Sequence, residues 1–287
     1  MWKRISSVLA VSALALGLTT SAQAADKVRV GWTAWSDAEF VTKLATRILE
    51  ERMNQEVELV QTDIAPQYQG VASGDIDLML MSWLPGTHSD YMDKVGGKVV
   101  NLGLLYDHAK LGWIVPEYVP KDKVSSITDL KNDEIRSKLD GQITGIDPGA
   151  GLTRLSKKVI KEYDLDYDLQ ISSGAGMTAA LKRAVQNDDW IVVTGWSPHW
   201  KFGAYDLRYI DDPKGVLGSW ERIHAIAREG LYQDNIEAAT MVSRMWIPID
   251  DLQAAMYTAQ QSSYEKAVDQ YIKNNKKRIN YWVTGKM

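Results

Sequence analysis

The sequence has no cysteine, only two phenylalanines and only four histidines in 287 residues. Without cysteine the chain forms no disulfide, offers no thiolate for chemistry and carries no lipid on a cysteine. No pair of histidines has the spacing of a zinc site such as His-Glu-x-x-His, and no Gly-x-Ser-x-Gly motif of a hydrolase is present. We therefore expect a protein that is not an enzyme and that holds neither a metal nor a cofactor.

The chain also lacks a basic surplus and long apolar runs. Its formal net charge is −4, which argues against nucleic acid as a partner. The run Lys276-Lys-Arg278 is expected to be the solvated end of a helix. No segment beyond the N-terminus reaches the roughly 18 unbroken apolar residues of a membrane span.

Residues 1–24 have the parts of a secretory signal peptide. Lys3 and Arg4 form a positive start, Val8 to Leu18 is a short apolar run, and Ala22-Gln-Ala24 is a small-residue cleavage site. We expect cleavage after this segment and a mature protein in the periplasm. The remaining length suffices for one large or two medium domains.

Tryptophan is abundant where phenylalanine is scarce, with 11 residues. Trp35, Trp83 and Trp196 each follow a predicted strand and open a polar loop beside Gly or Pro. Aromatic residues of the core are expected inside helices and strands. Aromatic residues at the start of a loop are more typical of a binding surface. The indole face is the strongest aromatic partner for a cation. Three indoles at one site would suit a quaternary ammonium group, which has positive charge but no hydrogen-bond donor.

Short β-like runs alternate with amphipathic helical runs along the chain. This alternation predicts an α/β fold, with parallel-rich sheets flanked by helices. The predicted strands are residues 27–30, 57–61, 76–81, 99–102, 110–116, 141–145, 169–172, 190–194 and 207–210. The predicted helices are residues 38–53, 66–73, 152–163, 177–186 and 264–272.

The strand–helix series occurs twice and is followed by a helical C-terminal quarter. This order predicts two lobes joined by two crossings, near residues 105–117 and 205–218. We assign residues 25–112 and 213–287 to lobe 1 and residues 113–212 to lobe 2. In such open α/β sheets, ligands bind beyond the carboxyl ends of the strands, which is where the three tryptophans are expected.

The segment Gly145-Ile-Asp-Pro-Gly-Ala-Gly151 runs directly into a predicted helix. Exposed backbone N–H groups and the helix dipole favour an anion at such a place. The segment is not a P-loop, because no Gly-Lys-Ser/Thr follows, and it lacks the Gly-x-Gly-x-x-Gly dinucleotide fingerprint. A carboxylate is therefore a better guest than a pyrophosphate.

Two further residues are candidates for the same site. His88 lies five residues after Trp83 and is either a donor to an anionic group or a packing residue of the loop. Tyr68 is either a further wall of the cage or a surface residue. Trp32 and Trp200 are interpreted as supports or core, and the remaining tryptophans as structural: Trp113, Trp190, Trp220, Trp246 and Trp282.

Three motifs in this order resemble the glycine betaine-binding proteins of ABC importers. They are Ser82-Trp-Leu-Pro-Gly-Thr-His88, Gly145–Gly151 and Val193-Thr-Gly-Trp-Ser-Pro-His-Trp200. The resemblance runs over nearly the whole mature chain. It implies the two-lobed type II periplasmic-binding-protein fold with two hinge crossings. It also implies a monomer that delivers its ligand to an ABC transporter permease in the inner membrane.

The resemblance further implies which residues bind. The family's cage of three tryptophans corresponds to Trp35, Trp83 and Trp196. Its carboxylate site corresponds to the backbone N–H groups of Gly145 and Ile146 together with the side chain of His88. The expected ligand is glycine betaine.

Other functions remain open on the sequence. Within the same class, the ligand is alternatively carnitine, choline, proline betaine, trimethylamine N-oxide or dimethylsulfoniopropionate. A sugar receptor would need several converging Asp, Asn and Arg residues at strand ends, and few are found. A secreted hydrolase would need a nucleophile motif that the sequence lacks.

Overall fold

The computed structural model describes residues 27–287, so the expected signal peptide lies outside the described residues. Nine strands form one mixed sheet in the order β2-β1-β3-β9-β4-β7-β5-β6, with β8 also paired to β4. The strands are β1 (Val28–Trp32), β2 (Val57–Gln61), β3 (Leu78–Leu84), β4 (Val99–Pro116), β5 (Gln142–Thr144), β6 (Asp168–Gln170), β7 (Val193–Ser197), β8 (Leu207–Tyr209) and β9 (Trp220–Arg228).

The sheet is parallel at its two ends and antiparallel in the middle. At one end β1 pairs in parallel with β2 and β3, and at the other β5 pairs in parallel with β6 and β7. Between them, β9 is antiparallel to both β3 and β4, and β4 is antiparallel to β7. The expectation of an α/β fold with parallel-rich strands is confirmed, with the addition of this antiparallel centre.

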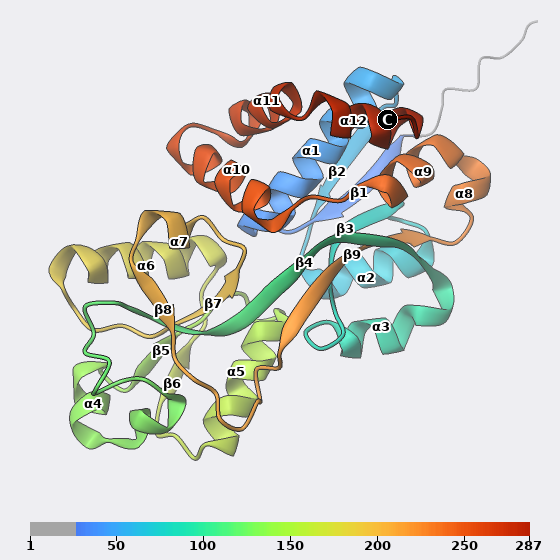
Figure 1. Cartoon of the computed structure of the whole chain (residues 1–287). Coiled ribbons are helices and arrows are strands. Elements are labelled where there is room, and N and C mark those ends of the chain that lie inside the picture. The colour runs from blue at the N-terminus through green and yellow to red at the C-terminus, as the bar shows by residue number, and fades with distance from the viewer. Residues whose placement is uncertain (1–26) are drawn as a thin grey trace, which may run out of the picture.

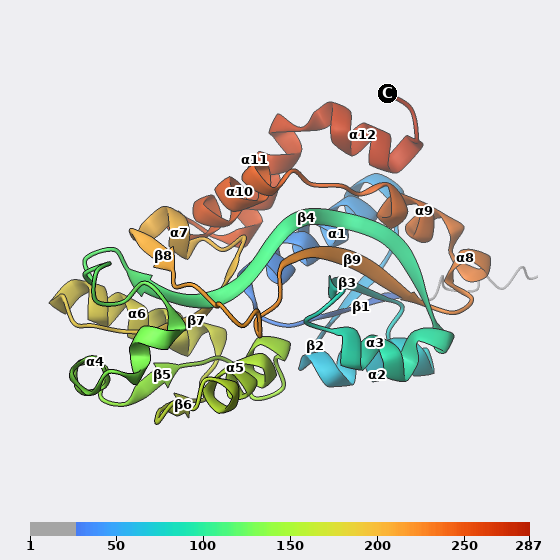
Figure 2. The same cartoon turned by 60° about the horizontal axis from the view of Figure 1, so that its bottom comes forward.

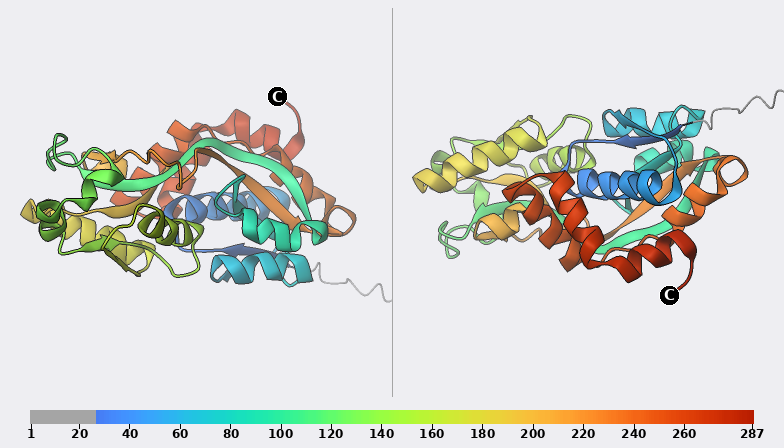
Figure 3. Two further views of the ribbon diagram at one scale, coloured as in Figure 1. Left: turned by 90° about the horizontal axis from the view of Figure 1, so that it is seen from below. Right: turned by 90° about the horizontal axis from the view of Figure 1, so that it is seen from above.

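Helices cover both faces of the sheet (Figure 1). They are α1 (Ser36–Met53), α2 (Ile64–Ser73), α3 (Ser89–Val95), α4 (Asp133–Lys138), α5 (Gly151–Glu162), α6 (Gly174–Asn187), α7 (Lys201–Ala204), α8 (Leu231–Asp234), α9 (Ile236–Arg244), α10 (Ile249–Gln261), α11 (Tyr264–Asn274) and α12 (Lys276–Thr284). Around β1 to β3, α1 and the C-terminal helices lie on one face and α2 and α3 on the other (Figure 3). Within residues 27–287, no helix has both the length and the apolar character that crossing a bilayer requires.

The central strands differ from the sequence prediction. The predicted strands 99–102 and 110–116 are parts of β4, a single strand of 18 residues that runs between the two ends of the sheet (Figure 2). Register shifts in β4 between Asn101 and Gly103, and twice between Leu104 and Ala109, break its apolar alternation. Strand β9, which lies beside β4, was not predicted.

Helix α1 shows how local sequence positions the site. Its residues Leu44, Ile48 and Leu49 are fully buried at helical spacing. Asp37 and Glu39 lie in its first turn, where negative charge is favourable. Since Trp35 is the N-cap residue of α1, the first turn of this helix lies next to the predicted tryptophan site.

Not every tryptophan that was interpreted as structural is buried. Trp113 and Trp282 are buried in the core. Trp220 and Trp246 are 62% and 46% exposed, so neither of these two is a core residue. The Trp220 ring meets His108 edge-on, with ring centroids 6.2 Å apart.

Candidate functional site

A cavity lies where the two parallel ends of the sheet meet. Its walls come from both ends, because Trp35 and Trp83 belong to the β1–β3 end and Trp196 to the β7 end. The residues that line it are Trp35, Asp37, Trp83, Thr87, His88, Leu111, Ile146, Ala150, Gly151, Leu152 and Trp196. The structure therefore brings together five of the seven predicted site residues.

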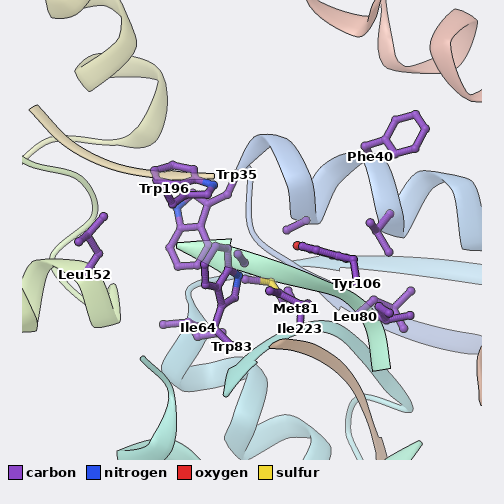
Figure 4. Close-up of a cluster of buried hydrophobic side chains, with 14 of the residues drawn as sticks. Trp35, Phe40, Ile64, Leu80, Met81, Trp83, Tyr106, Leu152, Trp196 and Ile223 are labelled. Carbon is purple, nitrogen blue, oxygen red and sulfur yellow. The ribbon is translucent and has the colours of Figure 1, made fainter. Parts of the chain in front are cut away.

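The three tryptophans point toward one another (Figure 4). The ring centroids of Trp35 and Trp196 are 6.4 Å apart at an interplanar angle of 59°. All three side chains are buried. Trp83 and Trp196 lie inside β3 and β7 rather than after them, because both strands end a few residues later than predicted. Leu152 from α5 faces this group across the cavity (Figure 4).

Two carboxylates accept hydrogen bonds from two of the three indoles. Trp196 Nε1 donates to Asp37 Oδ1 over 2.9 Å, and Trp35 Nε1 donates to Asp147 Oδ2 over 2.9 Å. Asp37 also accepts a 2.6 Å hydrogen bond from Tyr106 Oη. Burial raises the pKa of Asp37, and the hydrogen bonds from Tyr106 and Trp196 oppose that rise. These bonds restrain the orientation of the two indoles.

His88 is a neutral hydrogen-bond donor at the cavity wall. Burial, reinforced by the charge of Arg154, lowers the pKa of His88 to about 3. Its Nδ1 accepts the backbone N–H of Trp83 over 3.1 Å. In a neutral imidazole the other nitrogen then carries the proton. Nε2 is therefore the donor nitrogen of the His88 ring, and a backbone hydrogen bond with Met81 opposes the fall in its pKa.

The start of α5 forms the opposite wall. Ile146, Gly151 and Leu152 line the cavity at the N-terminal end of this helix of 12 residues. Among residues 27–287 the N–H of Ile146 has no hydrogen-bond partner. The N–H of Gly145 instead donates to Gln170 O over 2.8 Å, continuing the pairing of β5 with β6. The N–H of Gly145 is thus used within the sheet and the N–H of Ile146 is free among the described residues. The expectation that both N–H groups bind an anion stays a prediction.

Tyr68 packs beside His88. Its hydroxyl group is 2.7 Å from Ser82 Oγ, and its ring stacks on Tyr91 with centroids 5.3 Å apart. The edge-to-face contact with His88 has a centroid distance of 5.8 Å. Burial raises the pKa of Tyr68. The expectation of a surface residue is wrong, because the Tyr68 side chain is fully buried. The alternative of a cage wall stays a prediction.

A buried lysine lies against Trp196. Lys201 Nζ is 4.5 Å from the centroid of the Trp196 ring and 3.3 Å from Trp196 O. Burial lowers the pKa of Lys201 well below its ordinary value. The ring of His199 meets Trp196 edge-on at 4.7 Å. The sequence analysis missed both supports, although His199 and Lys201 follow Trp196 closely in the chain.

Comparison with known proteins assigns the family. The family described as the substrate binding domain of ABC-type glycine betaine transport systems matches residues 26–274. The chain belongs to this family. A curated member, the glycine betaine/carnitine transport binding protein GbuC of Listeria monocytogenes, is 39% identical over 161 residues. That match spans 55% of this chain and about half, 53%, of the Listeria protein.

Solved structures of the family share the fold. The lactococcal OpuAC in its closed-liganded conformation with glycine betaine is 36% identical, with a TM-score of 0.84 over 90% of this chain and 100% of that one. The glycine betaine/L-proline-binding protein ProX of Borrelia burgdorferi is 30% identical, with a TM-score of 0.83 over 90% of this chain and 97% of that one. These matches confirm the expected periplasmic-binding-protein fold.

Proposed function

We propose that this protein binds glycine betaine and delivers it to the permease of an ABC importer. One observation carries the proposal: the cavity offers different chemistry to the two ends of a small zwitterion. Trp35, Trp83 and Trp196 present indole faces that suit a trimethylammonium head. His88 Nε2–H and the N-terminal end of α5 suit a carboxylate.

The expected affinity follows from these contacts. A desolvated cation–π contact contributes roughly 0.5–2 kcal/mol, and a charge at a helix terminus about 0.3–1 kcal/mol. Three indoles, the helix terminus and the His88 donor together support a dissociation constant near the micromolar level, about −8 kcal/mol. Asp37 lines the cavity, which places its carboxyl group near the cationic head.

We assign the parts of the chain as the sequence analysis did. Residues 25–112 and 213–287 form lobe 1, residues 113–212 form lobe 2, and β4 is one of the two crossings. The ligand contacts both lobes only in the closed form, so binding favours closure. We propose that the protein acts as a monomer in the periplasm after cleavage of residues 1–24, without chemistry on its ligand.

A calorimetric titration tests the function. The mature protein is titrated with glycine betaine, carnitine, choline, proline betaine, trimethylamine N-oxide and dimethylsulfoniopropionate. We expect the tightest binding for glycine betaine, and weaker binding for choline, which has no carboxylate for His88. Absence of heat with every one of these compounds would remove the proposed function.

A further inference from the structure

Glu221 makes a buried set of hydrogen bonds outside the cavity. It lies in β9 and is 3% exposed. Its carboxylate accepts the N–H of Gly86 over 3.2 Å, the N–H of Thr87 over 2.9 Å and the hydroxyl of Thr87 over 3.0 Å. A Cβ on Gly86 would lie 2.7 Å from Glu221 Oε1, so only glycine fits there without a shift. The turn that precedes His88 is therefore fastened to β9.

Thr87 is bonded on its other side to the opposite wall of the cavity. Its carbonyl oxygen accepts a 3.1 Å hydrogen bond from Arg154 Nη2, which belongs to α5. The N-terminus of α5 approaches the same carbonyl so closely that a Cβ on Gly151 would lie 2.4 Å from it. Thr87 and Gly151 both line the cavity. One residue thus joins Glu221 on one side to α5 on the other.

Glu221 lies in β9, which with β4 connects the two ends of the sheet (Figure 1). It is paired with Ala109 of β4, next to the register shift between Tyr106 and Ala109. Two successive contacts connect this pair of strands to α5. Glu221 contacts Thr87, and Thr87 contacts Arg154 and Gly151. A displacement of Glu221 would move Thr87, whose carbonyl group contacts α5. It would also move His88, the next residue in the chain.

We propose that Glu221 is a positioning residue for ligand binding, a role that rests on the proposed function. It holds Gly86 and Thr87 so that α5 meets the Thr87 carbonyl when the cavity closes, with His88 at the same edge of the cavity. A carboxylate suits this task because it accepts hydrogen bonds from several donors at once. The closed form therefore depends on Glu221, although Glu221 does not touch the ligand.

The test variant is Glu221→Gln. Its amide nitrogen cannot accept the hydrogen bonds that a carboxylate oxygen accepts from Gly86 and Thr87. Glu229→Gln is the matched control, since Glu229 is exposed just beyond the same strand. Glycine betaine binding is followed by stopped-flow tryptophan fluorescence. For Glu221→Gln we expect a dissociation rate raised at least tenfold and an association rate within threefold of the wild type. Glu229→Gln keeps both rates.

A second measurement does not depend on ligand. Hydrogen exchange of the unliganded protein reports the amides of Gly86 and Thr87, which we expect to be protected in the wild type and to exchange at least tenfold faster in Glu221→Gln. Unchanged exchange, or wild-type dissociation in the variant, overturns the role of Glu221. A wild type that binds no glycine betaine refutes the proposed function instead, and the exchange result then still decides whether Glu221 holds the turn.

Discussion

The indole of Trp196 and the carboxylate of Asp37 form a buried 2.9 Å hydrogen bond between residues 159 positions apart. A second hydrogen bond of this kind joins the indole of Trp35 to the carboxylate of Asp147, 112 positions apart. In each pair the tryptophan comes from one end of the sheet and the aspartate from the other. The two indoles therefore reach their observed orientation only when both ends of the sheet are together.

The first prediction concerns Asp37→Asn. A hydrogen bond to a charged group stabilises by about 1.5–3 kcal/mol and one to a neutral group by about 0.5–1.5 kcal/mol. We expect glycine betaine to bind about tenfold more weakly, which corresponds to about 1.4 kcal/mol. Calorimetry at pH 7 measures this, with exposed Asp122→Asn as the control. A dissociation constant within twofold of the wild type would show that the charge of Asp37 is unimportant.

The second prediction concerns Trp196→Ala. Loss of one cation–π contact of about 1.4 kcal/mol weakens glycine betaine binding by about tenfold or more. Trp246→Ala removes an exposed indole instead and should leave the affinity unchanged. Calorimetry is preferable to fluorescence here, because the substitution removes a fluorophore. If both variants bind equally well, Trp196 does not belong to the site.

The third prediction uses Gly149, in the loop before α5, and Gly151, the first residue of α5. A Cβ on Gly151 would lie 2.4 Å from Thr87 O, whereas a Cβ on Gly149 meets nothing within 4 Å. Gly151→Ala should therefore hinder closure and weaken binding by about 10- to 100-fold, since overpacking costs roughly 1–3 kcal/mol. Gly149→Ala should bind as the wild type does. Equal affinities for the two variants would refute the close approach of α5 to Thr87.

The fourth prediction concerns the pH dependence of stability. The pKa of His88 is about 3 in the folded protein and about 6.5 in an unfolded chain. Because the folded pKa is the lower one, the unfolded chain takes up the proton first as pH falls. The contribution of His88 is fully present above about pH 6.5 and is lost progressively toward pH 3. Between pH 7 and pH 5 this amounts to about 2 kcal/mol.

Urea unfolding at pH 7, 6 and 5 measures that contribution. The free energy of unfolding of His88→Gln should fall less steeply than that of the wild type over this range. His108→Asn is the control, because the His108 side chain is exposed and asparagine tolerates its left-handed backbone. If His88→Gln shows the same slope as the wild type, His88 is not held neutral by burial.

The local elements were predictable because their signals are local. The apolar spacing of Leu44, Ile48 and Leu49 predicts α1, and the structure places this helix at 36–53, within two residues of the prediction. The long strand β4 was divided in two because its register shifts interrupt the apolar alternation. Strand β4 is continuous because it pairs with β9. Strand β9 comes more than a hundred residues later in the chain.

The sequence by itself determined the fold class, the three tryptophans at strand ends, and the loop that leads into α5. These follow from the residue types within short windows and from the rule that parallel strands present their carboxyl ends together. Only the tertiary structure decided that the N–H of Gly145 is used within the sheet, that Tyr68 lies behind His88, and which carboxylates hold the indoles. Hydrogen bonds between residues distant in the chain form when folding brings them together, and no local pattern records them.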